Sequence, residues 1–262
     1  MPPLDLPSAS WRPAVFLGVL ALMFAVETVF PARPWTAPRM RRLGFHSLVA
    51  AVNTLLYRLL LAAPLLALAA AVHARGWGLA GALGLSGPTE LAASVVVLDL
   101  LNYWWHRWNH RVGLLWRFHR AHHYDTHVDV TTSLRFHFGE LALSGGLKAL
   151  WLLAWGPSPA AFLLFEAAIT AFAQFHHSNI DLPEPAERLV RLVHMTPRLH
   201  AAHHTVSLRS RDANYATIFL WWDRLFGSFA EADPAELKTL GLAEGRESDL
   251  SYAAFWAAPA QL

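Results

Sequence analysis

Residues 89–123 read TELAASVVVLDLLNYWWHRWNHRVGLLWRFHRAHH, and this stretch decides the fold. The first half, up to Trp105, is an apolar run long enough to cross most of a bilayer as a helix, and it ends in aromatic residues typical of a membrane interface. The second half holds five histidines: His106, His110, His119, His122 and His123. Residues three or four apart share one face of a helix, so these imidazoles should point to a common region.

Two more histidine clusters lie further along the chain, at residues 176–177 and 200–204. Thr196 and Pro197 predict a helix start before the second cluster, because threonine caps a helix well and proline fits its first position. Neutral imidazole binds iron, zinc and copper, so the pattern predicts two bound metal ions. The nine expected ligands are His106, His110, His119, His122, His123, His177, His200, His203 and His204. His176 is an alternative to His177.

The composition is that of a membrane protein rather than of a soluble domain. The chain has 262 residues, of which 55% are hydrophobic and only 15% are charged. It has no cysteine, which excludes thiolate-bound zinc and iron–sulfur clusters and leaves histidine and carboxylate as the strong ligands. The formal net charge of +2 is too small to indicate a nucleic-acid partner.

We expect an all-α integral membrane protein with about four transmembrane helices and a histidine-rich helical cap. The predicted spans are residues 14–30, 48–72 and 89–105, followed by a short helical hairpin at 141–155 and 160–175 around GPSP. The positive-inside rule gives the orientation, since residues 31–47 hold four arginines and residues 107–135 hold five. That side is expected to be cytoplasmic, in the inner or cell membrane, and all the histidine clusters fall on it.

The metal and its supporting side chains follow from the same pattern. A nearly all-histidine site suits a borderline transition metal, and its place beside a bilayer favours iron over zinc. Neutral ligands leave two ions strongly positive, so hydrogen-bond acceptors are expected to orient the imidazoles from outside. The candidates for that orienting role are Asp99, Glu140, Glu166 and Asn214.

Several ordered blocks of sequence carry a family resemblance. They are DLLNYWWHRWNH at 99–110, LWRFHRAHH at 115–123, DVTTSLRFHFGE at 129–140, FHHSNI at 175–180, TPRLHAAHH at 196–204, DANY at 212–215 and WDRLFG at 222–227. In these blocks the chain resembles the fatty acid hydroxylase / sterol desaturase superfamily of integral-membrane di-iron enzymes, specifically its bacterial sterol desaturase family branch. The first ninety residues match only as generic spans.

The resemblance implies two iron ions (Fe2+/Fe3+) held by the nine histidines, with dioxygen as a co-substrate. It implies an oxidoreductase that hydroxylates or desaturates a lipid, whether a sterol, a fatty acyl chain or a related isoprenoid or ether lipid. Electrons are expected from an external ferredoxin, cytochrome or reductase, since nothing in the chain resembles a flavin or haem module. His137 lies in the RFHxxE block, and its place among the iron ligands stays open.

The expected organisation is a transmembrane anchor region at 1–88, a catalytic domain at 89–230 and a C-terminal surface segment at 231–262. Two other functions are compatible with many histidines. One is a membrane metal transporter, which would place ligands along a path through the spans, or a metal-binding protein without oxygenase activity. A haem electron carrier would need two facing histidines rather than nine gathered ones.

Overall fold

The computed structural model describes residues 11–35, 38–231 and 233–261, and in this part the chain forms helices and two isolated β-bridges but no strand. Three helical segments of the described part are long and apolar enough to cross a membrane: Trp11–Val29, Arg39–Ala82 and Pro159–His177. The all-α membrane architecture is confirmed. The number of spans stays a prediction, because the helix that contains residues 89–105 is not among these three.

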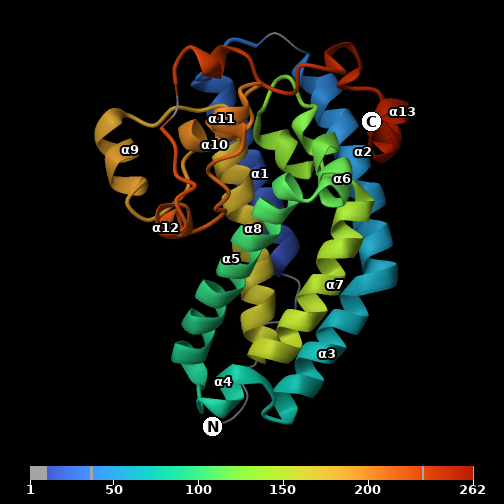
Figure 1. Cartoon of the computed structure of the whole chain (residues 1–262), viewed down its shortest axis with the longest axis vertical. Helices are drawn as coiled ribbons and strands as arrows, with labels where there is room; N and C mark the ends of the chain where they lie inside the picture. Colours follow the sequence, from blue (N-terminus) through green and yellow to red (C-terminus); the bar gives the residue numbers. More distant parts are fainter. Residues whose placement is uncertain (1–10, 36–37, 232, 262) are drawn as a thin grey trace.

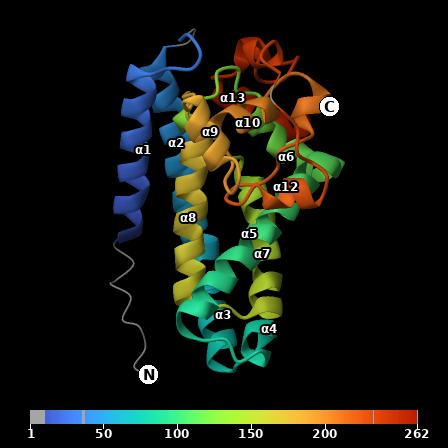
Figure 2. The same ribbon diagram turned by 90° about the vertical axis from the view of Figure 1, so that its left-hand side faces the viewer.

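Long helices form a bundle, and short helices gather at one end of it as a cap (Figure 1). The bundle helices are α1 (Trp11–Val29), α2 (Arg39–Tyr57), α3 (Ala63–Ala74), α5 (Gly87–Arg111), α7 (Phe138–Trp155) and α8 (Pro159–His177). The α2 helix passes through the π-helical turn η1 (Arg58–Ala62) into α3, and the short α4 (Gly78–Ala82) follows at the far end of the bundle. Both α1 and α5 pack against α8, which therefore lies at the centre of the bundle (Figure 2).

The predicted hairpin is present as α7 and α8, joined at Gly156. Gly156 has a φ of 75°, in the left-handed region, and a Cβ there would overlap the carbonyl oxygen of Trp77. Ser158 caps α8 by accepting the amide N–H of Ala161. The carboxylate of Glu90 on α5 accepts both the hydroxyl and the amide N–H of Ser158, which ties the start of α5 to the start of α8.

The cap is built from short helices, two of which, α6 and α10, carry histidine clusters. Its elements are α6 (Gly113–His123), η2 (Val130–Leu134), α9 (Glu184–Val190), α10 (Pro197–His203), α11 (Leu208–Arg211), α12 (Trp221–Leu225), η3 (Glu236–Lys238), η4 (Arg246–Ser248), α13 (Tyr252–Ala257) and η5 (Ala258–Ala260). An apolar cluster that includes Tyr103, Met195, Leu199 and Tyr215 joins α5 to α10. Burial of these side chains fixes the cap on the end of the bundle.

A buried ionic network connects α2 to the loop after α6. The guanidinium of Arg42 donates to both carboxylate oxygens of Asp125 at 2.7 and 2.9 Å and to Asp129 at 2.7 Å. Arg42 and Asp125 are fully buried. Burial alone would raise the pKa of Asp125, but Arg42 holds that pKa well below its usual value. Charges removed from water need such pairing, so this network locks the loop in one conformation.

The C-terminal segment from residue 233 onward contributes to the cap interior. Leu240, Leu242 and Phe255 are buried, and the last two pack against Phe45 of α2 and Tyr124 of the loop after α6. Thr205, next to the last histidine cluster, forms a β-bridge with Leu240. The segment therefore supports the histidine-bearing helices from outside.

Candidate metal centre

The first histidines of the site project from α5 and α6. His106 and His110 lie one turn apart at the end of α5, which extends past residue 105 as one continuous 25-residue helix. Gly113 begins α6, which runs to His123. The predicted continuation of the apolar helix into the first histidine cluster is confirmed, and the turn at residues 112–113 folds α6 back against α5.

The other histidines come from α10 and from the end of α8. Thr196 caps α10 by accepting the amide N–H of Leu199, and Pro197 occupies the first turn, as the sequence predicted. His200 and His203 lie within α10, and His204 follows it. His177 is the last residue of α8. Four separate segments thus carry their imidazoles to one place.

The nine expected histidines form two groups in the structure. Within each group one ligand nitrogen per residue lies within 4.8 Å of all the others. The first group, called group one, contains His106, His110, His119, His123 and His203. The second, called group two, contains His122, His177, His200 and His204.

Helix geometry explains how the consecutive histidines divide between the two groups. His119 and His123 are four residues apart and share group one, whereas His122 belongs to group two. In the same way His200 and His204 share group two. Neighbouring residues on a helix point about 100° apart, so a His-His pair faces two different centres. Each HxxHH cluster therefore supplies ligands to both groups and holds the groups next to each other.

The spacing of nitrogens in group two fits a single ion. The Nε2 atom of His177 lies 3.1 Å from that of His122 and 3.0 Å from that of His200, and the Nε2 atom of His204 lies 3.2 Å from that of His200. Two nitrogens that bind one transition-metal ion at about 2.1 Å and at a right angle are about 3.0 Å apart. The ring nitrogens of group two thus have the separation that a shared ion imposes.

Group one fits a metal for a second reason, which is its set of unpartnered nitrogens. The Nε2 atoms of His106, His119 and His203 are buried without a hydrogen-bond partner among the described residues, as are ring nitrogens of His110 and His123. The Nδ1 atom of His110 lies 3.4 Å from the carboxylate of Asp212, so its Nε2 atom is the one left for the centre. A buried polar atom without a partner costs about 1–3 kcal/mol. Several buried nitrogens that face one region need a common partner to offset this cost. A metal ion can be that partner, because it accepts a lone pair from each nitrogen.

The opposite ring nitrogen of five histidines is held by an acceptor. Four Nδ1 atoms lie 2.7–3.0 Å from backbone carbonyl oxygens, and the Nδ1 atom of His119 lies 3.0 Å from the carboxylate of Glu140. The four carbonyl pairs are His106 with Tyr215, His122 with Arg135, His177 with Ala173 and His203 with Ala213. A carbonyl accepts only a proton, so Nδ1 carries the hydrogen and Nε2 presents its lone pair to the centre.

Burial keeps the cap imidazoles uncharged. It lowers the pKa of five histidines well below the ordinary value of 6.5, and the neighbouring imidazoles lower it further: these are His122, His123, His200, His203 and His204. A protonated imidazole cannot bind a metal. At neutral pH these rings are therefore in the state that coordinates.

The remaining expected site residues lie in different surroundings. His176 packs its ring 4.0 Å from that of His200 but is not in either group, because it projects from α8 one residue away from His177. His137 caps α7 by accepting the amide N–H of Gly139, and its ring packs against Trp256. These contacts give His137 a structural role at the start of α7.

Of the four expected orienting residues, Glu140 alone has a described hydrogen bond to one of the nine histidines. Asp99 instead accepts the backbone N–H groups of Ile218 and Phe219 and the indole N–H of Trp222. Glu166 pairs with Lys148 at 2.7 Å within the α7–α8 hairpin. The expectation that Asp99 and Glu166 contact the imidazoles does not match the structure, because each carboxylate satisfies closer donors.

Asn214 acts through the backbone. Its φ is 56°, in the left-handed region that asparagine tolerates, and its side-chain amide donates to the carbonyl oxygens of Leu199 and Ala230. The turn that it forms places the carbonyl of Ala213 at His203 and the carbonyl of Tyr215 at His106. Sequence reasoning missed these carbonyls, since backbone atoms leave no side-chain signal. The DANY block at residues 212–215, which contains Ala213 and Tyr215, was the sequence feature closest to predicting them.

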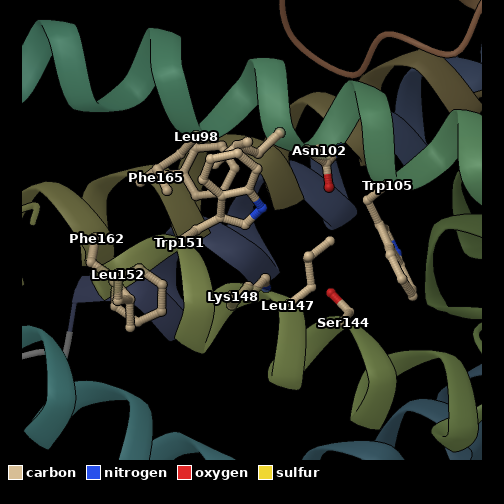
Figure 3. Close-up of a pocket in the computed structure, with 11 residues that line it drawn as sticks. Leu98, Asn102, Trp105, Ser144, Leu147, Lys148, Trp151, Leu152, Phe162 and Phe165 are labelled. Carbon is tan, nitrogen blue, oxygen red and sulfur yellow. The ribbon is translucent and has the colours of Figure 1, made fainter. Parts of the chain in front are cut away.

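A narrow crevice lies between α5, α7 and α8 on the bundle side of the centre (Figure 3). Trp105, the neighbour of His106, lines it together with Asn102, Ser144, Lys148 and Trp151. Its volume is about 20 Å³, which is space for about one water molecule. The crevice therefore lies among apolar helices, and Trp105 is its lining residue that is nearest in sequence to group one.

Comparison with known proteins places the chain. A family model described as "Fatty acid hydroxylase" matches residues 91–228, which include all nine histidines and the turn at Asn214. The chain belongs to the fatty acid hydroxylase family. No solved structure matches it.

Members of the fatty acid hydroxylase family with similar sequences include two named lipid enzymes. The chain is 32% identical over 141 residues to "Ornithine lipid hydroxylase OlsE" of Rhizobium tropici. The aligned region covers 53% of this chain and 41% of that protein. It is 31% identical over 140 residues to "Alkylglycerol monooxygenase" of Xenopus tropicalis, covering 50% of this chain and 28% of that protein. The chain thus spans less than half of the length of these relatives.

Proposed function

We propose that this protein is a membrane-bound di-iron oxidoreductase that uses dioxygen to hydroxylate or desaturate a lipid. The observation that carries the proposal is the convergence of nine imidazoles into adjacent groups of five and four. Both groups draw on the cap helices α6 and α10, whereas a metal transporter would need ligands along a path through the bundle. The relatives named as a lipid hydroxylase and a lipid monooxygenase add support.

The chain's own residues would hold the metal pair and keep its surroundings fixed. Group one would bind one iron ion and group two the other. When bound, the iron supplies dioxygen activation and the oxidising power to break a C–H bond. The carbonyls of Tyr215, Ala213 and Arg135 keep the proton on Nδ1, so that Nε2 stays available. Burial of the rings excludes bulk water from the reacting region.

The substrate would approach from the bundle. The crevice lies between the apolar helices α5, α7 and α8, and its lining residue Trp105 directly precedes His106, so we infer that a lipid chain reaches group one from this side. Its present volume of about 20 Å³ admits only one small group. Entry of an alkyl chain therefore requires the side chains of Trp105 or Trp151 to move.

We place the centre at the cytoplasmic face of the cell membrane. The arginine-rich segments at 31–47 and 107–135 lie at the cap end, and positive residues favour the cytoplasmic side. Electrons would come from a separate donor, a ferredoxin, a cytochrome or a reductase. The chain has no cysteine for an iron–sulfur cluster of its own.

Comparative lipid analysis under ¹⁸O₂ tests the proposal. Cells that express the wild-type chain should accumulate a lipid that has gained one labelled oxygen or lost two hydrogens. Cells that express His122→Ala, which removes a group-two ligand, should lack that lipid. Arg209→Met, a substitution of an exposed cap residue with no described contact, serves as the matched control and should retain it. Identical lipid profiles for an iron-loaded wild type and for His122→Ala would contradict the function.

A further inference from the structure

A second, larger cavity lies in the cap, with a volume of about 390 Å³. That volume falls within the range of about 300–1,000 Å³ that small-molecule sites occupy. Its walls come from the loop after α1, the loop after α6, the segment after α8, the start of α10 and the region of η3. Nothing in the proposed chemistry uses this cavity.

Several wall residues of the cavity are close in sequence to group two. Ile180 in its wall follows His177 by three residues, and Arg198 precedes His200 by two. Leu240, also in the wall, pairs with Thr205, which directly follows His204. Three residues of extended chain span at most about 10 Å. The backbone of Ile180 and of Arg198 therefore lies within about 10 Å of the backbone of the group-two residues His177 and His200.

Positive charge exceeds negative charge in the lining. Arg33, Arg198 and Lys238 line the cavity, and Asp181 is the one carboxylate among its described lining residues. Arg198 is already paired, since it donates to Asp181 at 2.8 Å and to Glu184 at 3.1 Å. Arg33 and Lys238 have no ion pair among the described residues. These two cations thus line the cavity without a close ion pair, although the carboxylates of Asp129, Glu27 and Asp181 act on Arg33 from a greater distance.

Arg33 is held in position for an anion. Its guanidinium donates to the carbonyl oxygen of Val128 at 2.9 Å, and its backbone is fixed by Asn179, which accepts its N–H and donates to its carbonyl oxygen. Burial lowers the pKa of Arg33 to about 10, which still leaves the group charged at neutral pH. The remaining guanidinium N–H groups suit the oxygens of a phosphate or a carboxylate.

Apart from Thr126 and His127, the rest of the lining is apolar, and the cavity lies where a candidate span ends. Ile180, Leu237 and Leu240 provide apolar walls beside the cations. Ala32 and Arg33 come only three and four residues after α1, whose last residue is Val29. The end of a spanning helix marks the level of lipid head groups. The site therefore combines an anion-binding wall with apolar surface near the bilayer boundary.

We propose that this cavity binds the phosphate or carboxylate group of an anionic amphiphile, which is the substrate of the neighbouring metal centre. The inference rests on the proposed function and narrows its substrate class to lipids with a negatively charged head. The site of oxidation would then lie on the part of the lipid near its head group. A neutral sterol or a plain hydrocarbon would leave Arg33 and Lys238 without a partner.

Ligand-induced thermal stabilisation tests the cavity without turnover. The iron-loaded full chain in detergent is kept free of dioxygen, and its melting temperature is measured against dioleoylphosphatidylglycerol, dioleoylphosphatidylcholine and inorganic phosphate. Phosphatidylglycerol should raise the melting temperature at lower concentration than phosphatidylcholine does. Lys238→Glu should raise the apparent dissociation constant for phosphatidylglycerol by roughly fivefold, the size of one exposed ion pair. Arg209→Met, an exposed cap arginine outside the cavity, should leave it unchanged.

Each outcome decides one part of the proposal. A similar dissociation constant for wild type and Lys238→Glu would overturn the cavity as an anion site. If inorganic phosphate saturates the effect and phosphatidylglycerol adds nothing, the cavity is an anion site but the proposal that it binds an amphiphile is wrong. Because no dioxygen is present, binding is scored independently of oxidation. Specific phosphatidylglycerol binding without any oxidised lipid in cells would count against the proposed function and not against the cavity.

Discussion

At the scale of single residues, Glu140 links the metal centre to the bundle. Its carboxylate on α7 accepts the Nδ1–H of His119 on α6. Such an acceptor fixes the orientation of a ligating imidazole and makes Nε2 a better donor to the metal. Of the expected orienting residues, it is the one whose side chain has a described hydrogen bond to an imidazole of the two groups.

Replacing Glu140 should weaken metal binding more than it weakens the fold. We expect Glu140→Ala to lower the affinity of group one for iron by about 10–100-fold, the usual effect of losing such an acceptor. Glu140→Gln keeps an oxygen acceptor, so it should lower the iron affinity by less than Glu140→Ala does. A competitive chelator titration measures this, with Glu184→Ala on the cap surface as the control. Equal affinity in wild type and Glu140→Ala would show that the hydrogen bond does not matter.

Arg42 is the residue whose loss should cost the most stability. Arg42→Met leaves the carboxylates of Asp125 and Asp129 buried without a counter-charge, which typically costs about 3–5 kcal/mol. The exposed neighbour Arg41 provides the matched control, since Arg41→Met should change the free energy of unfolding by less than about 0.5 kcal/mol. Denaturant unfolding in detergent measures both. A small effect at Arg42 would mean that the network contributes little to stability.

The pH dependence of that difference follows from the carboxylates. Arg42 holds the folded-state pKa of Asp125 well below its usual 3.8 despite burial. A lowered carboxylate pKa stabilises the fold at pH values above 3.8, and this contribution is lost only as the pH falls through the folded-state pKa. In the wild type this contribution is constant between pH 5 and pH 8, but in Arg42→Met burial without the counter-charge raises the pKa of Asp125, so the destabilisation should be larger at pH 8 than at pH 5. An equal destabilisation at pH 8 and pH 5 would show that the pKa of Asp125 stays low without Arg42 and would contradict this account.

Prediction from sequence at this scale succeeded where spacing carries the information. The nine histidines lie at helical spacings, so their convergence could be read from the chain. Arg42 could not be separated from Arg39 and Arg41, because burial of one arginine in a cluster depends on a carboxylate that lies 83 residues away. The hydrogen-bond donors of Asp99 and the ion-pair partner of Glu166 also lie elsewhere in the chain, so they could not be predicted either. Pairing between distant segments leaves no local signal.

At the scale of elements, turn chemistry decides where the helices end. The hairpin between α7 and α8 was predictable because Gly156, Pro157 and Pro159 interrupt two apolar runs. The capped start of α10 was predictable from Thr196 and Pro197. The π-helical turn η1 inside the second span was not, since residues 58–62 contain neither glycine nor proline.

A pair of glycine substitutions tests the hairpin. Gly156→Ala places a side chain in the left-handed region and against the carbonyl of Trp77. We expect the free energy of unfolding to fall by at least about 1–3 kcal/mol. Gly146→Ala within α7 meets no atom within 4 Å, so it should be neutral or stabilise the protein by up to about 1 kcal/mol. Melting temperatures of the two variants measure the contrast. Comparable values would contradict the close approach of the two segments.

At the scale of the whole molecule, the bundle and the cap together assemble the metal centre. Four helix ends and the loops after them bring the nine imidazoles together, and the carbonyls that orient them come from further segments of the chain. Sequence predicted which residues gather. It could not predict how they divide between two groups, because that depends on the relative rotation of α6 and α10, which follows from packing rather than from spacing.

The most direct test is the iron content of group-selective variants. We predict about two iron ions per wild-type chain by elemental analysis of the purified protein. Removing two ligands of group two, with His200→Ala and His204→Ala together, should leave about one ion, and so should His110→Ala with His123→Ala in group one. A wild-type chain that binds one ion or none, or double variants that both keep two, would contradict the division of these histidines into two metal sites.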